Sequence, residues 1–470
     1  MWVRRLLLVP ILLGLSALGA YVYFYNDPQP DPRMACYYGA YDLTDGRIVV
    51  VTPSSGLQNL RTVLMSGTTE FLQPIARNAE GLPTTFSRST GWTGQTQPAG
   101  NQVMFGSCEE GTIAIESAGA QGVRGTRMTF DATDVTFESR GLKLAGRLLM
   151  PRREGPVPVA VFVHGSEDYS AITFNRLQYL FAANGIGMFT YDKRGTGSSE
   201  GRYSQDFHLL ADDAAAALTK ARETAGRLAS EVGFVGGSQA GWIEPLAAMK
   251  VKADFVLVGF GLVESPLAED RDEVFDDLRT AGYGDDVIAT AREITDATAR
   301  VMVSDFKDGY EELDAVRAKY GKEPWYAKIE GEFTGELLNY PNWLIQIIGP
   351  WFDQGTSWEY DPRPALQAYQ GPHLWILAGR DSSAPPENTP RVLREVQASR
   401  PNLDIVMFPT ADHGIIEFVE KDGARSETRF SEGYFQLLVD WVLFKEPAVK
   451  AQGPVVYDGG PPAAAAAAQP

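Results

Sequence analysis

The chain has 470 residues and a formal net charge of −18, with 42 Lys and Arg against 60 Asp and Glu. At about 150 residues per domain, this length predicts two or three domains or one large elaborated domain. An acidic surface repels phosphate backbones, so we expect no nucleic-acid partner. Two cysteines and four histidines are too few for zinc clusters, iron–sulfur centres or haem motifs. We therefore expect no metal and no cofactor.

Residues 1–25 are predicted to be a signal anchor or a signal peptide. Arg4 and Arg5 precede an uncharged, mostly apolar run over residues 6–25. As a helix, such a run reaches about 30 Å, which is enough to cross a bilayer. Aromatic residues at its end favour a retained anchor, whereas small residues before them suit cleavage. In both cases we expect the rest of the chain to be exported, as a membrane-anchored, periplasmic or secreted protein.

An oxidising compartment would allow Cys36 and Cys108 to pair. The sequence does not say whether their Cα atoms come within about 7 Å of each other. Two free thiols therefore stay an alternative, as does lipid attachment at Cys36, although the residues before Cys36 form a poor lipid-attachment motif.

Composition divides the rest of the chain. Residues 26–37 form a proline-rich linker, and residues 38–130 are predicted to form a small β-rich accessory domain. Residues 131–262 and 363–445 are predicted to form one domain, interrupted by a helical lid at 263–362. Residues 446–470 are rich in Pro, Ala and Gly and are predicted to be disordered.

Short apolar strands alternate with helical stretches after residue 131. The predicted strands are 157–163, 186–191, 232–235, 255–260, 374–378 and 404–408. Short continuous apolar runs are typical of strands buried on both faces of a parallel sheet. With right-handed crossovers, they predict an α/β fold with a doubly wound, mostly parallel sheet.

The lid carries two groups of residues whose roles the sequence leaves open. Four tryptophans could line a substrate pocket or form the lid's own core: Trp325, Trp343, Trp351 and Trp358. Four acidic residues fit a solvated helix face better than a site for a substrate amine: Glu264, Glu269, Asp270 and Asp272.

A strand, a turn of small residues and a helix surround Ser238 in the stretch VGFVGGSQAGWI. Such an elbow lifts a serine to the carboxyl edge of the sheet, where its hydroxyl can reach a substrate. Gly236 lies two positions before the serine, but Ala240 stands where the G-x-S-x-G pattern has its last glycine. We expect the small alanine to be tolerated.

A serine nucleophile needs an imidazole to accept its proton, and the imidazole needs a carboxylate to orient it. Asp381 follows one predicted strand and His413 follows the next. Serine, acid and histidine therefore occur in the chain order of the α/β-hydrolases. Asp412 is a weaker candidate for the acid, because Asp381 comes from a separate strand and can approach the ring from the side opposite the serine.

Three further motifs accompany this order: the turn His164-Gly165-Ser166, the stretch DKRGTGS over residues 192–198, and AGRD over residues 378–381. With them, the chain resembles the α/β-hydrolase superfamily, of the dienelactone-hydrolase or serine-aminopeptidase-like type with an extra N-terminal domain and a helical lid. The resemblance implies that Ser238 is the nucleophile, Asp381 the acid and His413 the base. It also implies that the backbone N–H groups of Ser166 (or Glu167) and Gln239 stabilise the oxyanion.

The function that this resemblance implies is an exported serine hydrolase that cleaves small-molecule carboxylic esters through an acyl-enzyme. A serine aminopeptidase-like peptidase or amidase is the first alternative. A non-catalytic binding protein of hydrolase fold is the second. The membrane is expected as a further partner if the N-terminal segment stays uncleaved.

Overall fold

The computed structural model of the chain describes residues 29–92, 100–386, 388–421, 424–447 and 454–457. The predicted signal segment, residues 1–25, lies outside these ranges. Within them, no helix combines the length and the apolar character that a membrane span requires. The chain divides into two compact units at residue 128. The short segment 65–67 is the exception, because it belongs to the second unit although it lies within the sequence of the first.

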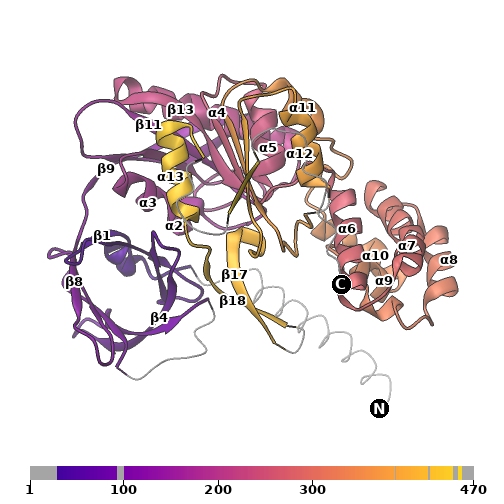
Figure 1. Cartoon of the computed structure of the whole chain (residues 1–470), viewed down its shortest axis with the longest axis horizontal. Helices are drawn as coiled ribbons and strands as arrows, with labels where there is room; N and C mark the ends of the chain where they lie inside the picture. The colour runs from indigo at the N-terminus through magenta and orange to yellow at the C-terminus, as the bar shows by residue number, and fades with distance from the viewer. Residues whose placement is uncertain (1–28, 93–99, 387, 422–423, 448–453, 458–470) are drawn as a thin grey trace, which may run out of the picture. The chain divides into compact units, whose positions relative to one another are not determined.

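The first unit is a closed β-barrel (Figure 1), which confirms the predicted β-rich domain and defines its architecture. Each strand pairs with the next in antiparallel fashion, and β1 also pairs with β8, which closes the ring. Alternate side chains point inward, as the two-residue period of a strand requires, and Val51, Phe86 and Val103 are completely buried. The strands are β1 Gly39–Leu43, β2 Ile48–Pro53, β3 Leu60–Leu64, β4 Thr69–Arg77, β5 Pro83–Thr90, β6 Gln102–Phe105, β7 Thr112–Glu116 and β8 Val123–Arg127.

A disulfide joins Cys36 to Cys108, whose Cα atoms lie 5.4 Å apart. Cys36 lies on the short 3₁₀ helix η1 (Pro32–Tyr37), and Cys108 lies in the turn between β6 and β7. Of the alternatives that the sequence left open, the structure therefore shows the paired one. The bridge spans 72 residues of sequence and restricts the unfolded chain accordingly.

The second unit is built on a nine-stranded sheet in the order β19-β16-β15-β14-β13-β11-β12-β10-β9. The six strands from β11 to β16 run parallel, as their registers show, and β9, β10 and β19 are antiparallel to their neighbours. This confirms the predicted mostly parallel sheet. The strands are β9 Phe130–Ser139, β10 Leu142–Pro151, β11 Val157–Val163, β12 Gly187–Tyr191, β13 Ala229–Gly237, β14 Val256–Gly259, β15 His373–Ala378, β16 Leu403–Phe408 and β19 Val455–Tyr457.

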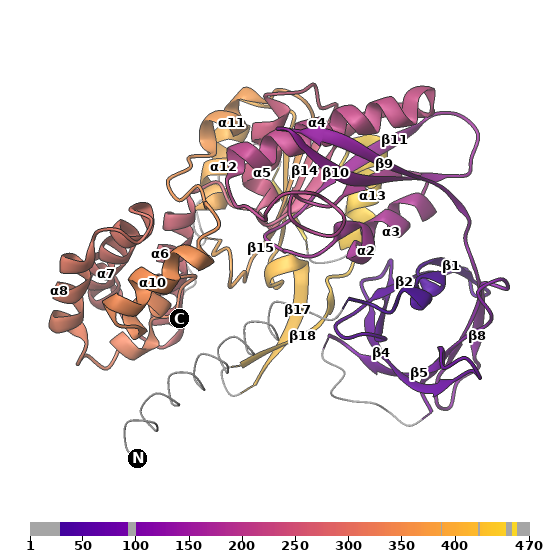
Figure 2. The same ribbon diagram turned by 180° about the vertical axis from the view of Figure 1, so that it is seen from behind.

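Helices cover both faces of the sheet. Figures 1 and 2 show α4, α5, α11 and α12 on one face and α3 and α13 on the other. The first group contributes apolar side chains to a continuous core with the strands, including Leu218, Ile243, Leu366 and Leu393. The helices are α2 Ala171–Phe174, α3 Leu177–Ala183, α4 Phe207–Ala225, α5 Ala240–Ala248, α11 Arg363–Ala368, α12 Thr389–Gln397 and α13 Tyr434–Phe444.

The predicted lid is an all-helical insertion between β14 and β15. It has its own apolar core, with Val274, Ile294, Val301 and Leu313 fully buried, so it packs as a body in its own right. Its helices are α6 Pro266–Thr280, α7 Asp285–Val303, α8 Tyr310–Tyr320, α9 Thr334–Asn339 and α10 Asn342–Phe352. Figure 1 shows this group beside the end of the sheet that carries α12.

Two features near the C-terminus were not predicted. A hairpin, β17 (Ile416–Lys421) and β18 (Ala424–Phe430), follows β16. The strand β19 lies in the segment 446–470, which we predicted to be disordered. That prediction is wrong for residues 455–457, because their backbone pairs with the edge of β16.

Candidate active site

Ser238 lies in a strained turn between β13 and α5. Its φ of 56° is in the left-handed region, which costs a residue with a side chain of order 1–3 kcal/mol. The turn needs small neighbours: a Cβ on Gly236 would lie 2.6 Å from the Cβ of Ala240, and one on Gly237 would overlap the ring of Phe260. Ala240, which replaces the last glycine of the G-x-S-x-G pattern, is completely buried in this turn. The turn therefore has room for the methyl group of an alanine at this position.

The structure brings His413 and Asp381 together. The Nδ1 atom of His413 lies 2.9 Å from Oδ1 and 3.1 Å from Oδ2 of Asp381. Asp381 is only 3% exposed, and it also accepts hydrogen bonds from the backbone N–H groups of Ser383 and Ala384. With Nδ1–H donating to the carboxylate, Nε2 of His413 is left as the nitrogen that can accept a proton.

The ring of Phe260 lies close to both the serine elbow and the histidine. Its ring lies against Gly237, the residue before Ser238, and its centroid is 4.9 Å from that of the His413 ring. Ser238 N–H donates to the carbonyl of Gly259, 2.9 Å away, which fixes the elbow to the end of β14. Among the described residues no hydrogen bond joins Ser238 Oγ to His413, which is common in sites without a bound substrate.

The pKa of His413 is raised above its ordinary value. Burial on its own would lower it, but the hydrogen bond from the ring to Asp381 and the negative charge of that carboxylate outweigh burial. The acid therefore does two things at this site: it selects the tautomer of the imidazole, and it stabilises the imidazolium that forms when the ring accepts a proton.

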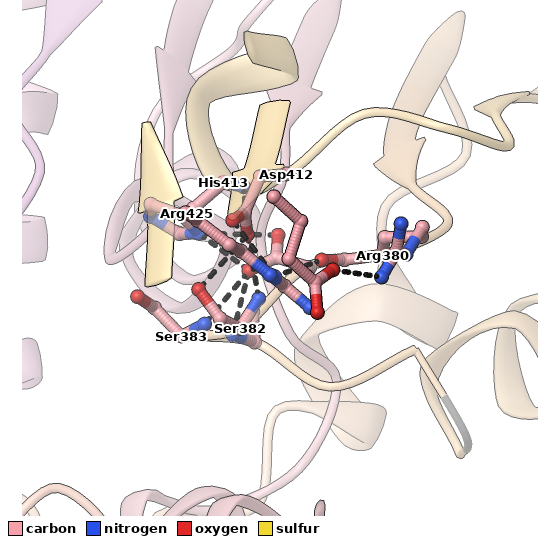
Figure 3. A network of polar contacts seen from close by, with 9 residues as sticks. Arg380, Ser382, Ser383, Asp412, His413 and Arg425 are labelled. Atoms are coloured by element: carbon pink, nitrogen blue, oxygen red, sulfur yellow. Dashed lines mark hydrogen bonds and ion pairs between the residues drawn. The ribbon is translucent and has the colours of Figure 1, made fainter. Parts of the chain in front are cut away.

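Asp412, the weaker candidate for the acid, has no hydrogen bond to the imidazole ring among the described residues, although its charge also raises the pKa of His413. Its Oδ1 accepts hydrogen bonds from the N–H and Oγ of Ser382 and from the N–H of His413, at 2.8, 2.9 and 2.8 Å. Its Oδ2 pairs with Nη1 of Arg425 at 2.7 Å (Figure 3). Asp412 therefore ties the loop that carries Asp381 to the loop that carries His413.

The two predicted oxyanion donors follow neighbouring strands. Val163 of β11 pairs with Gly236 of β13. Ser166 and Gln239 each come three residues after one member of that pair. Within the described ranges, the backbone N–H of neither residue has a hydrogen-bond acceptor in the protein. Both donors are thus available to a bound group. The Glu167 side chain instead turns back toward His164, with Oε2 at 3.5 Å from Nδ1 of that ring.

The remaining histidines do not take part. His164 and His373 are buried, and burial lowers the pKa of both. His208 lies on the surface of α4 with its ring against Tyr360. In the described part of the chain, no group of three or more His, Cys, Asp or Glu side chains is arranged to hold a metal ion.

The acidic residues at the start of α6 are not the solvated face that we predicted. Asp270 and Asp272 are 1% and 7% exposed. Asp270 accepts hydrogen bonds from the N–H groups of Phe333 and Thr334, and Asp272 accepts one from Asn388. Long-range partners that the sequence does not reveal therefore bury these carboxylates, while Glu264 and Glu269 are half-buried.

Glu273, one turn after Glu269, is a buried carboxylate of the lid that the sequence did not suggest. It is 8% exposed, and no hydrogen bond or ion pair reaches it or Glu269 within the described residues. Burial and the charges of Glu332 and Asp270 raise the pKa of Glu273 to about 9. Both glutamates also lie close enough to Asp381 for its charge to raise their pKa values.

The four lid tryptophans divide into two pairs. Trp325 is buried in the lid core, and Trp358 packs against Phe333. Trp343 and Trp351 lie on α10 and are 63% and 81% exposed. The segment after α10 contacts the loop before α4, where Gln205 N–H donates to the carbonyl of Gln354.

Arg425 and Phe260 are further residues of the site that the sequence analysis missed. Phe260 carries a weak signal, as an aromatic residue that ends a buried strand next to the elbow. No sequence signal marks Arg425, because its pairing with Asp412 can be recognised only once the β17–β18 hairpin is folded.

Residues 155–260 match the family model described as serine aminopeptidase, S33. No curated protein matches the chain. Among solved structures, an esterase from Pyrococcus furiosus is 14% identical over 60% of this chain and 84% of that one, with a TM-score of 0.40. The acylaminoacyl peptidase of Pyrococcus horikoshii is 13% identical over 86% of this chain and 59% of that one, with a TM-score of 0.42. Est1E from Butyrivibrio proteoclasticus, solved with ferulic acid bound, is 14% identical over 66% of this chain and 96% of that one, with a TM-score of 0.36.

A doubly wound sheet of this kind can support many activities, so the assignment depends on what its loops carry. The matched segment runs from β11 to β14 and contains both the turn at Ser166 and the elbow at Ser238. The two strands that follow the lid supply the hydrogen-bonded Asp381 and His413 at the ends of β15 and β16. The segment 155–260 thus resembles the serine aminopeptidase, S33 family, and the strands within it and after the lid carry a serine, an acid and a histidine at their ends.

Proposed function

We propose that this protein is an exported enzyme that hydrolyses carboxylic esters through an acyl-enzyme on Ser238. The hydrogen bond between His413 and Asp381 carries the proposal, since it leaves Nε2 of the ring as a base at the edge of the sheet that also holds Ser238. The strained backbone of Ser238 supports the same role, because such strain is typical of a nucleophile elbow.

The proposed reaction has two halves. His413 accepts the proton of the Ser238 hydroxyl as Oγ attacks the ester carbonyl, and the N–H groups of Ser166 and Gln239 stabilise the oxyanion. The intermediate collapses, the C–O bond to the alcohol breaks, and the imidazolium gives its proton to the leaving alkoxide. Water then attacks the acyl-serine with His413 again as base, which releases the carboxylic acid and restores Ser238.

The test is the turnover of p-nitrophenyl esters by the wild type and by Ser238→Ala. We expect the substitution to lower kcat by about 10⁴-fold or more, and to abolish labelling by a fluorophosphonate. Ser89, which is buried in the barrel, provides a control, because Ser89→Ala should leave both readouts unchanged. Equal turnover by wild type and Ser238→Ala would reject the proposal. A wild type that neither turns over esters nor reacts with the probe would favour the non-catalytic binding protein.

A peptidase or amidase is the second candidate, and the carboxylates of the lid favour it. Glu269 and Glu273 lie near Asp381 without a basic partner in the described structure, and the raised pKa values of both would fall if a protonated amine of a substrate paired with their ionised forms. Aminoacyl p-nitroanilides and simple acyl esters separate the two functions. Turnover of the anilides that falls in Glu273→Gln, with ester turnover unchanged, would support the peptidase; no anilide turnover would reject it.

Export is the third part of the proposal. The apolar segment 6–25 behind Arg4 and Arg5 supports it, as does the Cys36–Cys108 disulfide, which is a feature of oxidising compartments. Cell fractionation with intact-mass analysis of the recovered protein tests it. A full-length mass in the membrane fraction indicates an anchor, and a mass lacking about 25 residues in the soluble exported fraction indicates cleavage. Recovery of full-length protein in the cytoplasm would contradict export.

A further inference from the structure

The turn that carries the candidate oxyanion donor Ser166 is held by two side chains from the loop after β12. The Nζ of Lys193 donates to the carbonyl of Gly165, 2.7 Å away. The hydroxyl of Tyr203 donates to the carbonyl of Ser166. Successive peptide groups of this turn are therefore each fixed by a side chain that comes from elsewhere in the chain.

Lys193 is an unusual residue for this position, because its side chain is buried. It is 2% exposed, and in the described residues the carbonyl of Gly165 is its one hydrogen-bond acceptor and no carboxylate pairs with it. Its Nζ lies 4.6 Å from the centroid of the Tyr203 ring, which gives it a cation–π contact. Burial lowers the pKa of Lys193 to about 7. A buried amine is costly, so an apolar residue would serve better here if packing were the only requirement.

The geometry of a peptide group connects these contacts to the oxyanion site. A trans peptide is planar, so its C=O and its N–H point in opposite directions. Lys193 holds the carbonyl of the Gly165–Ser166 peptide, which directs the N–H of Ser166 away from the lysine. Tyr203 holds the carbonyl of the next peptide in the same way, and so directs the N–H of Glu167.

The loop that carries Lys193 is rigid on both sides of it. Asp192 accepts hydrogen bonds from Ser170 Oγ at 2.8 Å and from the N–H of Ser198 at 3.0 Å. Arg194 makes a buried two-point contact with Asp213, at 2.7 and 2.6 Å. Anchors on both neighbours fix where the Lys193 side chain starts, and therefore where its ammonium group can reach.

From these contacts we infer that Lys193 and Tyr203 are positioning residues of the oxyanion turn: Lys193 holds the peptide whose N–H, that of Ser166, is directed at the oxyanion, and Tyr203 holds the peptide that follows it. This inference assumes the proposed ester hydrolysis at Ser238. It assigns a function to the DKRGTGS stretch, which the sequence analysis identified only by resemblance: the aspartate and arginine anchor the loop, and the lysine between them acts on the oxyanion turn.

The test compares Lys193→Met, which removes the donor, with Lys193→Gln, which keeps one, and with Tyr203→Phe. Loss of one oxyanion donor lowers kcat by about 10²–10³-fold, so a donor that is present but misdirected should cost about 10–100-fold. We expect this loss in kcat for Lys193→Met and a smaller loss for Tyr203→Phe, with KM changed little. Lys193→Gln should recover part of the activity.

A second readout distinguishes positioning from general support of the fold. A trifluoromethyl ketone forms a tetrahedral oxyanion with a serine nucleophile, whereas the carboxylic acid product does not. Lys193→Met should weaken inhibition by the ketone by about the factor lost in kcat, and should leave inhibition by the product unchanged. Lys220→Met, a substitution on the surface of α4, is the matched control and should change neither.

Each outcome decides the inference. Folded Lys193→Met with wild-type kcat and wild-type ketone inhibition would overturn it. So would equal losses in ketone and product inhibition without recovery in Lys193→Gln. If Lys193→Met does not fold, the half-buried Tyr203→Phe carries the same test. If Ser238→Ala keeps full turnover, the proposed function fails instead, whatever Lys193 does.

Discussion

Nη1 of Arg425 lies 2.7 Å from Oδ2 of Asp412, and this ion pair joins the β17–β18 hairpin to the residue before His413. The hairpin has a second attachment, because Arg380 of the acid loop lies over the ring of Phe418 in β17, with 4.8 Å between its guanidinium carbon and the ring centroid. As Figure 3 shows, the acid loop, the histidine loop and the hairpin thus meet at one carboxylate. The hairpin is therefore part of the support of the site.

Removing the ion pair should loosen the alignment of His413 without removing any reacting group. Loss of the hydrogen-bond partner of a metal ligand typically costs about 10–100-fold, and by analogy we expect Asp412→Asn to lower kcat/KM by about 10–30-fold and Arg425→Met by less, about 3–10-fold. Steady-state kinetics with a p-nitrophenyl ester measure the effect. Arg391→Met, which breaks an exposed ion pair on α12, is the control and should change nothing. A loss in Asp412→Asn as large as that in Asp381→Asn would mean that the acid is assigned wrongly.

Asp381→Asn should lower the plateau of kcat/KM by about 10³–10⁴-fold, because the asparagine neither selects the tautomer nor stabilises the imidazolium. It should also change the pH profile. His413 acts as a base only when it is unprotonated, and Asp381 raises its pKa, so wild-type activity should fall as the pH drops through a value above 6.5. Without the carboxylate, burial dominates and this acid limb should move to lower pH.

A pH–rate profile of both proteins between about pH 5 and pH 9 checks the sign of the shift. An acid limb in Asp381→Asn that is unchanged, or moved to higher pH, would show that Asp381 does not set the pKa of His413.

Gly237→Ala should impair the site through Phe260. The new Cβ would overlap the phenyl ring, and a displaced ring would move against the imidazole of His413, whose centroid is 4.9 Å away. We expect a loss of about 10-fold or more in kcat/KM, together with a destabilisation of about 1–3 kcal/mol from overpacking.

The double variant Gly237→Ala with Phe260→Ala is the matched test of this explanation. It should recover part of the activity, because the space that the methyl group needs is then free. A double variant that is worse than either single variant would show that the two residues act independently.

Glu273→Gln should stabilise the protein at neutral and alkaline pH. The pKa of Glu273 is raised from 4.5 to about 9 on folding, so the folded state binds the proton more tightly than the unfolded state between these values. The free energy of unfolding of the wild type should therefore decline as the pH rises through this interval. The glutamine mimics the protonated acid and removes that decline.

We expect the Tm of Glu273→Gln to exceed that of the wild type by a few degrees, on the order of 2–4 °C, at pH 8.5, with little difference at pH 5. Glu336→Gln, an exposed substitution on α9, is the control. A Tm difference that is the same at both values, or larger at pH 5, would contradict the raised pKa.

The sequence was sufficient to predict the fold and to propose the three reacting residues, because each is marked by a local pattern. Ser238 lies in an elbow of small residues, and Asp381 and His413 each follow a short apolar strand. The roles of Asp412 and Asp270 could not be predicted in this way. The role of Asp412 depends on its ion pair with Arg425. The role of Asp270 depends on hydrogen bonds from backbone groups 63 and 64 residues further along the chain. Both sets of partners can be recognised only in the folded molecule.

The C-terminal strand β19 could not be predicted from the sequence for a different reason. Residues 455–457 lie in a stretch whose composition predicts disorder, yet their backbone pairs with β16 at the edge of the sheet. Three residues are too few for a propensity signal to appear, and the pairing depends on an edge strand more than forty residues earlier.

This short strand covers the side of β16 that would otherwise be bare. An uncovered β16 would present a row of open amide and carbonyl groups on the strand that leads directly into the His413 loop, and such an edge is a template for strand exchange with a second molecule. A chain shortened before residue 454 would thus be prone to self-association through the very strand that positions its base.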